Sequence, residues 1–181
     1  SKTDPRDPAE PTDRDNRLFR RMPLKQMEGE ILRDSLLALA GRLDRTMGGP
    51  VLPSDQADTG HRRTLYYRYA RDDRYRMLET FDAASVEECY RRHETVVPQQ
   101  SLALANSRLV QQLSAAIGER LTNKSDAEFI TVAYETILGR QASATEHAVT
   151  LEACQKLIAT LKRQGTDTAA ARLDAHRHIA H

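Results

Sequence analysis

Apolar residues recur at helical spacing along most of the chain, and this periodicity constrains the fold more than any other feature of the sequence. Leu32, Leu36 and Leu39 follow one another at i, i+4 and i+7, which places them on one face of a helix. The same spacing recurs in three later segments, 101–121, 125–139 and 143–165. We therefore predict a mostly α fold, a helical domain of at least four helices. The residues expected in its core are Leu36, Leu39, Leu109, Leu113, Val132 and Leu151.

Local signals predict where these helices begin and end. Two of them are expected to begin with a capping box, in which a serine and a glutamate three residues later satisfy each other's backbone N–H groups. The pairs are Ser125 with Glu128 and Ser143 with Glu146, and the glycines that end these helices are Gly139 and Gly165.

The first helix is expected to have Pro23 in its first turn and to stop before the Gly-Gly-Pro sequence at 48–50. Proline suits the first helical turn, and glycine accepts the left-handed backbone angles of a turn. A plain turn is preferred to an anion-binding loop at Gly48 and Gly49, because no phosphate-loop lysine follows.

One segment departs from the helical pattern. In "RRTLYYRYARD", Leu65, Tyr67 and Tyr69 lie at alternate positions, which indicates a strand. We predict a small β element near residues 62–70. A strand needs a partner, and no second strand of comparable quality is found in the sequence.

Composition divides the chain into three parts. Residues 1–16 hold closely spaced prolines, which exclude a regular helix and predict an extended Pro-rich arm. Residues 17–165 form the predicted helical domain, and residues 166–181 are expected to be weakly helical or frayed. The total of 181 residues suits one domain with an appendage.

Charge and hydropathy argue against two classes of partner. The chain has 27 Lys and Arg against 26 Asp and Glu, a net charge of +1, so bulk attraction to nucleic acid or acidic membranes is not expected. No apolar run approaches the roughly 20 residues that cross a bilayer. The polar first residues do not resemble a signal peptide. We therefore predict no nucleic-acid partner, no membrane span and no targeting signal in this chain.

The residue types that bind metals are scattered. Cys89 and Cys154 lie far apart and in no Cys-x-x-Cys setting, so free thiols are preferred to zinc ligands, and a disulfide between them stays open. His176, His178 and His181 gather at the C-terminus, where a frayed end is preferred to a metal site because further ligands are few. No metal and no cofactor is therefore expected in this chain.

The segment "RRHETVVPQQSLALANS" (91–107) allows two interpretations. Its polar start could be a catalytic loop that carries two arginines, a histidine and a glutamate. Alternatively, Pro98 starts a helix, and Thr95 helps to satisfy the backbone groups at the helix entry. The structural interpretation is preferred, because the spacing shows no acid–base geometry. Asn106 is expected to hydrogen-bond a neighbouring loop, with the turn at 48–50 as the candidate.

Arginines and tyrosines are interleaved between residues 62 and 92. Such a mixture can stack on and neutralise single-stranded nucleic acid or an anionic glycan. Acidic residues in the same stretch offset most of the positive charge. Internal salt bridges are therefore the preferred use of these arginines.

Five stretches occur in an order that resembles a known family. They are "DRDNRLFRRM", "EILRDSLLALAGRLDRTMGGP", "RRTLYYRYARD", "ECYRRHETVVPQQSLALANS" and "ETILGR". Together they resemble the planctomycetal-specific domain of unknown function fifteen-fifty-three over about residues 1–163. The resemblance implies a C-terminal module of large multidomain proteins that often carry a cytochrome c-like domain, and with it an extracytoplasmic or cell-surface location. The candidate functional or structural residues are Asn16, Arg17, Arg33, Asp34, Gly48, Gly49, Arg63, Arg92, Thr95, Pro98, Gln100 and Asn106.

Departures from the family pattern limit what the resemblance implies. His93 and Glu94 stand where the family usually has a polar, uncharged pair, which argues against a family-wide catalytic role for either residue. Gln141 replaces the usual proline after Gly-Arg, and "HRHIAH" replaces the usual closing Asn-x-x-Glu-Phe type helix. We expect an excised, truncated or divergent short member of the family. The chain contains no haem attachment sequence.

The sequence thus favours an uncharacterised accessory or interaction domain of a larger extracytoplasmic, cytochrome c-associated protein over an enzyme. Its expected partners are other domains of that parent protein and a second copy of the chain. The alternative is a polysaccharide-binding or hydrolytic module that uses the Arg/Tyr-rich segment 62–92. A deep pocket that joins Arg63, Arg92 and Asn106 would favour this alternative, whereas a flat, salt-bridged surface would favour the interaction domain.

Overall fold

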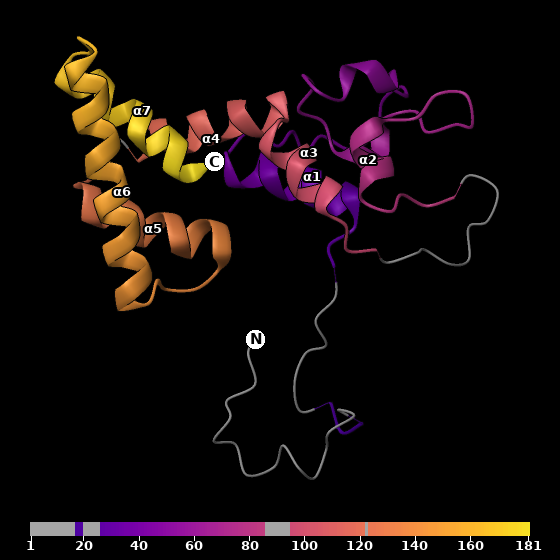
Figure 1. Cartoon of the computed structure of the whole chain (residues 1–181). Coiled ribbons are helices and arrows are strands. Elements are labelled where there is room, and N and C mark those ends of the chain that lie inside the picture. Colours follow the sequence, from indigo (N-terminus) through magenta and orange to yellow (C-terminus); the bar gives the residue numbers. More distant parts are fainter. Residues whose placement is uncertain (1–16, 20–25, 86–94, 122) are drawn as a thin grey trace.

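The computed structural model describes residues 17–19, 26–85, 95–121 and 123–181, which form seven α-helices and two short 3₁₀ helices (Figure 1). The predicted mostly α fold is confirmed. The elements in chain order are α1 (Gly29–Leu39), η1 (Ser54–Gln56), η2 (Thr64–Tyr66), α2 (Arg76–Thr80), α3 (Pro98–Ala105), α4 (Arg108–Arg120), α5 (Asp126–Leu138), α6 (Ala144–Arg163) and α7 (Thr168–Ala180).

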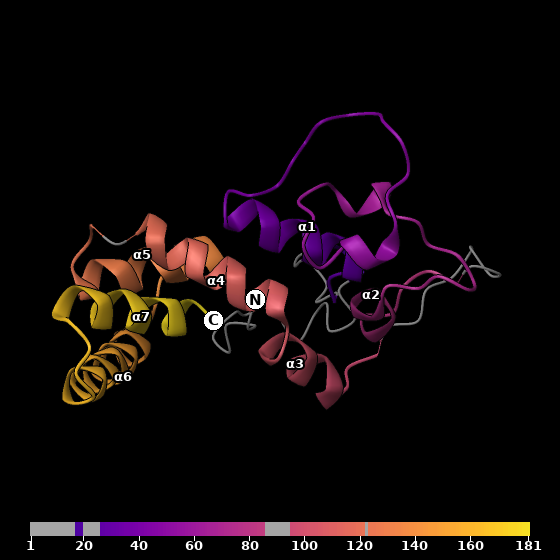
Figure 2. The same ribbon diagram turned by 90° about the horizontal axis from the view of Figure 1, so that it is seen from above.

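Helix α4 joins the two ends of the molecule. Figures 1 and 2 show α5, α6 and α7 gathered at one end of α4, and α1, α2 and α3 toward its other end. Helix α7 packs against α4, α5 and α6, whereas α1 packs against η2, α2 and α4. None of the described helices is long and apolar enough to cross a membrane.

The main apolar cluster lies between α1 and α4. Leu109 and Leu113, both expected in the core, are buried there, and Leu36 and Leu39 pack against the cluster while partly exposed. Apolar contacts therefore hold the two ends of the molecule together through α4. The buried members of this cluster are Leu37, Ala40, Leu109, Leu113, Ala116 and Ile117.

Helix α1 begins later than predicted and buries a different face. It begins at Gly29 because Glu28 is still extended, and Pro23, the expected start, lies outside the described residues. A Cβ atom on Gly29 would lie 3.2 Å from the Cα of Leu78, so glycine allows α1 and α2 to pack closely. The buried residues of α1 are Gly29, Arg33 and Leu37.

The single helix expected over 101–121 is instead two helices, α3 and α4. The backbone leaves the helix at Asn106, and the Ser107 side chain accepts a hydrogen bond from the Val110 N–H. Serine at this position caps a new helix more readily than it continues an old one. The break turns Leu102 away from the core, so this side chain is 64% exposed.

The predicted β element near 62–70 is not confirmed. Residues Thr64–Tyr66 form η2, and the neighbouring backbone makes only isolated bridges, such as those of Tyr67 with Leu52 and of Arg62 with Asp44. The Arg33 side chain donates to the Arg62 carbonyl, which a strand partner would otherwise use. Alternation of apolar residues was therefore not evidence of a strand at this position.

The C-terminal segment forms a packed helix rather than a frayed tail. Asp167 caps α7 by accepting the Ala169 N–H, and α7 buries Ala171, Ala175 and His176. Gly118 of α4 permits the close approach, because a Cβ there would lie 3.1 Å from a backbone nitrogen of α7. The small side chains of Ala171 and Ala175 are among the residues that α7 buries. The arm at 1–16 lies outside the described residues.

Both predicted capping boxes are present. Ser125 accepts the Glu128 N–H at the start of α5, and Ser143 accepts the Glu146 N–H at the start of α6. Gly139 ends α5 in the left-handed conformation with φ 65°. These helix ends could be predicted without the tertiary fold, because each depends on residues close together in the sequence.

Candidate functional site

Arg33 fixes the loop that follows α1. Its side chain is fully buried, and its Nη2 donates to the carbonyls of Ala57 and Gly60, each at 2.7 Å. Its Nη1 donates to the Arg62 carbonyl at 2.9 Å, and its guanidinium carbon lies 4.8 Å from the centre of the Tyr67 ring. A planar guanidinium can satisfy several carbonyls at once. Arg33 therefore acts here as an internal brace for residues 57–64.

Asp34 and Arg63 belong to the same brace. One carboxylate oxygen of Asp34 accepts both the Thr64 backbone N–H, at 2.8 Å, and the Thr64 hydroxyl, at 2.6 Å. The other oxygen lies 3.5 Å from the Arg63 Nε. The carboxylate of Asp34 thus caps η2, and its hydrogen bonds are internal to the fold.

Gly48 and Gly49 lie in an irregular stretch of backbone. Both glycines have positive φ angles, 77° and 99°. The Gly48 N–H donates to the Tyr66 hydroxyl at 2.9 Å, and the Arg62 guanidinium donates to the Gly48 carbonyl at 2.7 Å. The Gly48 amide is therefore engaged by the protein's own side chain and is not held open for an anion.

Between α1 and this braced loop lies a groove of about 760 Å³, which we call the α1 groove. Three apolar side chains on it are largely exposed: Ile31 at 50%, Met47 at 88% and Leu65 at 60%. Clustered exposed apolar side chains mark interaction surfaces more often than isolated ones do. The other residues lining the groove are Glu28, Glu30, Asp34, Ser35, Ala38, Leu43, Arg45 and Arg63.

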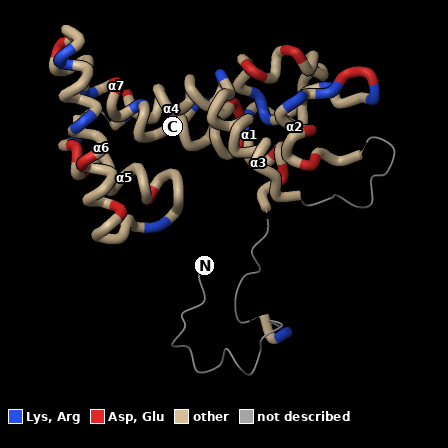
Figure 3. Tube along the Cα trace, in the orientation of Figure 1, with Lys and Arg blue, Asp and Glu red and all other residues tan. Residues whose placement is uncertain are grey.

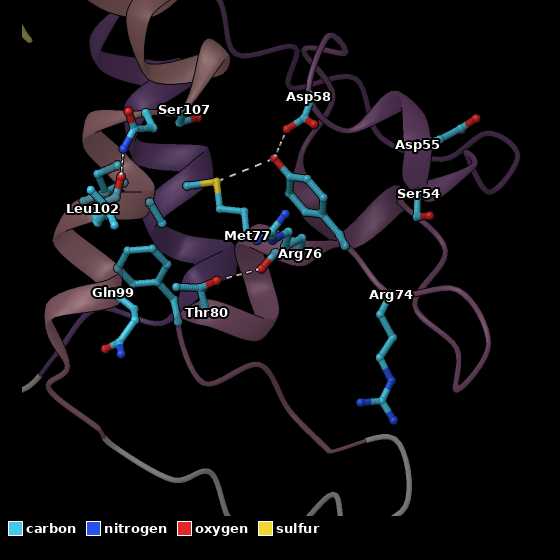
Figure 4. Close-up of a pocket in the computed structure, with 15 residues that line it drawn as sticks. Ser54, Asp55, Asp58, Arg74, Arg76, Met77, Thr80, Gln99, Leu102 and Ser107 are labelled. Atoms are coloured by element: carbon cyan, nitrogen blue, oxygen red, sulfur yellow. Dashed lines mark hydrogen bonds between the residues drawn. The ribbon is translucent and has the colours of Figure 1, made fainter.

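A second cavity, of about 690 Å³, lies between the 54–58 turn, α2 and α3 (Figure 4), and we call it the α2–α3 pocket. Its apolar side includes Met77, Phe81 and Leu102. On its polar side, the Tyr75 hydroxyl donates to the Asp58 carboxylate at 2.7 Å. Burial and the Asp58 acceptor raise the pKa of Tyr75. The phenol therefore stays protonated at neutral pH and cannot act as a base there.

Two arginines line the α2–α3 pocket. The Arg74 guanidinium lies 3.3 Å from the Glu79 carboxylate, so its charge is partly neutralised. Arg76 is exposed and forms no ion pair with a described residue. Figure 3 shows basic and acidic residues interleaved around α1 and α2, in agreement with the expected internal salt bridges.

Gln100 is the structural centre of the segment 95–107. It is buried, and its amide nitrogen donates to the carbonyls of Thr80 and Thr95, both at 3.1 Å. Its amide oxygen accepts from Gln26 at 2.9 Å and from the Val97 N–H at 3.4 Å. This one side chain therefore links α2, α3 and the lead-in to α1.

The other predicted residues of this segment have local roles. Pro98 is the first residue of α3, as predicted. The Thr95 hydroxyl and backbone N–H both donate to the Asp82 carboxylate, at 2.7–2.9 Å, so the hydroxyl does not have its expected role at the backbone of the helix entry. Asn106 donates to the Leu102 carbonyl of its own helix at 2.9 Å, so the expected contact with the turn at 48–50 is wrong.

A deep pocket that joined Arg63, Arg92 and Asn106 would have favoured the polysaccharide-binding or hydrolytic alternative, and the two of these residues that the structure describes line different cavities. Arg63 lines the α1 groove, whereas Asn106 lines the α2–α3 pocket. Asn16 and Arg92 lie outside the described residues, as do the His93–Glu94 pair and Cys89. Arg17 is exposed. The structure therefore does not bring together the group that would have favoured an enzyme.

A family model, PSD1, described as a protein of unknown function (DUF1553), matches residues 1–154. The chain belongs to this family. A search of curated proteins and a search of solved structures found no match. The match to DUF1553 ends inside α6, so α7 lies beyond it although α7 packs against α4, α5 and α6.

Sequence reasoning missed the α1 groove of this DUF1553 member. Met47 was part of a turn signal and Leu65 part of a strand pattern, so neither was taken for a surface residue. Met47 precedes two glycines, and nothing in that local sequence predicts that its side chain is 88% exposed. Among the described residues, one group could hold a metal, Asp126, Cys154 and His176, and it lies away from both cavities.

Proposed function

We propose that this DUF1553 chain is a non-catalytic interaction domain of a larger protein and that its α1 groove binds an apolar segment of a neighbouring domain. The observation that carries the proposal is the exposure of Ile31, Met47 and Leu65 around one groove. Burying such side chains against a partner is favourable by about 25 cal/mol per Å² of apolar surface.

The polar residues beside the groove support a structural role rather than catalysis. Arg33, Asp34 and Arg63 interact with the loop that forms the groove wall. A catalytic acid or base has to reach a substrate atom, whereas the described hydrogen bonds of Arg33 all end on the protein itself. These residues shape the groove.

The groove suits an amphipathic segment as its occupant. Its lining carries acidic residues, Glu28 and Glu30, and basic residues, Arg45 and Arg63, beside the apolar side chains. A helix with an apolar stripe and charges of both signs along its edges complements such a lining. The family membership favours a segment of the same polypeptide, because the family resemblance implies neighbouring domains.

Site-specific photo-cross-linking tests this assignment. A benzophenone amino acid is placed at position 47 in the natural polypeptide that contains this chain, and at position 149 as the control. Val149 is 61% exposed on α6, outside the groove. We expect position 47, and not position 149, to cross-link to another segment of the same polypeptide. Absence of a cross-link from position 47 would contradict the proposal, and a cross-link between two copies would replace it with self-association.

A second candidate function is the binding of an anionic polysaccharide at the α2–α3 pocket. The observation that favours it is Arg76, an exposed guanidinium beside an aromatic and apolar surface. Calorimetric titration with an oligosaccharide of uronic acids tests it, with Arg76→Ala as the variant and Arg42→Ala as the control. Binding that Arg76→Ala weakens about tenfold or more would support this function, and no heat of binding would exclude it.

The setting of the domain is part of the proposal. We propose an extracytoplasmic parent protein associated with cytochrome c, supported by the family resemblance alone. Protease treatment of intact cells provides the test, because an extracytoplasmic domain becomes accessible when the outer layers alone are permeabilised. Protection until the cytoplasm is opened would contradict this location.

A further inference from the structure

We propose that Asp126, Cys154 and His176 form a binding site for a thiophilic divalent cation of the zinc class. The three residues come from α5, α6 and α7, which lie together at one end of the molecule (Figure 1). One potential ligand atom from each residue lies within 4.8 Å of the other two. This inference departs from the expectation of no metal, because the sequence separates the three residues widely.

His176 provides the strongest sign that the site has a further occupant. The side chain is 0% exposed, and its ring stacks on Phe129 with 3.9 Å between centroids and 7° between planes. One ring nitrogen, Nε2, lies 3.0 Å from an Asp126 oxygen. The other, Nδ1, is buried and has no hydrogen-bond partner. A buried polar atom without a partner is unfavourable. Rotation of the imidazole ring about its Cβ–Cγ bond, followed by binding of a cation to Nδ1, would remove that cost.

The donor set decides the class of cation. Cys154 is a free and fully buried thiol, and it supplies the sulfur donor. Sulfur, imidazole nitrogen and a carboxylate oxygen are the ligands typical of zinc, whereas calcium and magnesium prefer oxygen alone. As the metal–sulfur bond forms, the thiol loses its proton to solvent.

The distances require only small side-chain movements. Zinc–ligand bonds of about 2.0–2.3 Å in a tetrahedron place neighbouring ligand atoms about 3.5 Å apart. In the ring position shown, His176 Nε2 lies 3.0 Å from an Asp126 oxygen, about 0.5 Å closer than two ligands of one zinc ion. Atoms as far apart as 4.8 Å would have to approach by about 1 Å, which side-chain rotation can supply.

Arg172 is the neighbour that has to be accommodated. Its Nε donates to the Asp126 oxygen at 2.6 Å, and its Nη2 donates to the Lys124 carbonyl at 2.7 Å. A carboxylate has two oxygens, so Asp126 can keep Arg172 as an outer partner while it binds a cation, as carboxylate ligands commonly do. The Arg172 side chain is 39% exposed, so solvent screens its charge.

Titration of the metal-free protein with Co²⁺ tests the site, because a cobalt–thiolate bond gives a charge-transfer absorption band. We expect the band to saturate at one Co²⁺ per chain and to disappear when Zn²⁺ is added. Zn²⁺ should also raise the melting temperature. No thiolate band at saturating Co²⁺ would overturn the proposal without the need for any variant.

Two matched pairs of variants locate the cation. Cys154→Ser should abolish the band and Cys89→Ser should keep it, because the chain has only these two cysteines. His176→Asn should weaken Co²⁺ binding at least tenfold, whereas His178→Asn, at an exposed position of α7, should not change it. Circular dichroism confirms folding of each variant. A band that survives in Cys154→Ser would assign the metal elsewhere and overturn the proposal.

Discussion

Arg33 shows how one buried cation can shape a stretch with no regular secondary structure. It sits on the face of α1 that packs into the protein, between Gly29 and Leu37. Its five hydrogen bonds end on Ala57, Gly60, Arg62 and Thr64. Because backbone carbonyls need partners when buried, the loop can lie against α1 without forming a sheet. The side chain thus takes the place of a β ladder.

Replacing Arg33 should therefore destabilise the fold strongly. Arg33→Met keeps an apolar stem but leaves the carbonyls of Ala57, Gly60 and Arg62 without their donor. We expect the free energy of unfolding to fall by at least about 3 kcal/mol. Arg42→Met, at an exposed position just after α1, is the control and should change it by less than about 0.5 kcal/mol. Urea unfolding measures both, and similar values for the two variants would contradict the internal role of Arg33.

Gln100 and Asn106 provide a second residue-scale comparison, since both are polar residues of the segment 95–107. Gln100→Leu strands two carbonyls in a buried position and should lower stability by about 2 kcal/mol. Asn106→Leu removes one exposed hydrogen bond within its own helix and should cost less than about 0.5 kcal/mol. Thermal melting of both variants is the measurement. Equal losses of stability in the two variants would contradict the view that the buried amide of Gln100 stabilises the fold more than the exposed amide of Asn106.

At the scale of elements, the sequence predicted those features of the helices that depend on residues close together in the chain. The capping boxes of α5 and α6 were predictable because each depends on residues three positions apart. The break between α3 and α4 and the packing of α7 were not, because they depend on distant partners. Gly118 matters to α7 only because it lies against Arg177. Arg33 lies on the face of α1 beside the leucine stripe, and no neighbouring residue indicates its distant acceptors. The α1 groove was not predicted for the same reason, because residues far apart in the sequence line it.

The connection between α5 and α6 should be sensitive to acid. Arg140 donates to both oxygens of Glu146, at 2.7–2.8 Å, and the Ser143 N–H donates to one of them at 2.9 Å. These bonds, that of Arg140 first, lower the pKa of Glu146 from 4.5 to about 2.

Because the folded protein binds this proton less readily than the unfolded chain, the stabilisation is complete above pH 4.5 and is lost as pH falls toward 2. Glu146→Gln should remove this part of the acid dependence, and Arg140→Met should reduce it by removing the main donor. Urea unfolding at several pH values provides the measurement, and high salt should weaken the effect because the pair is exposed. Parallel pH profiles for the wild type and Glu146→Gln would contradict this assignment.

At the scale of the whole molecule, α4 couples the two ends. Leu113 is 4% exposed and belongs to the cluster between α1 and α4. Replacing it with alanine leaves a cavity in the contact that joins the two halves. We expect Leu113→Ala to cost about 2–5 kcal/mol, and Leu102→Ala, which changes a side chain 64% exposed, to cost less than about 1 kcal/mol. Calorimetry checks both, and a small loss for Leu113→Ala would mean that the halves do not depend on this contact.

The α1 groove is the feature on which the functional account of the whole molecule depends, and hydrogen exchange tests it most directly. The exchange rates of backbone amides are compared between the isolated chain and the natural polypeptide, which the proposal expects to contain neighbouring domains. The account predicts slower exchange in the natural polypeptide for peptides that cover 43–52 and 60–68, with no change around Val149 on α6. Equal exchange rates in both proteins over 43–52 and 60–68 would show that no neighbouring domain occupies the groove.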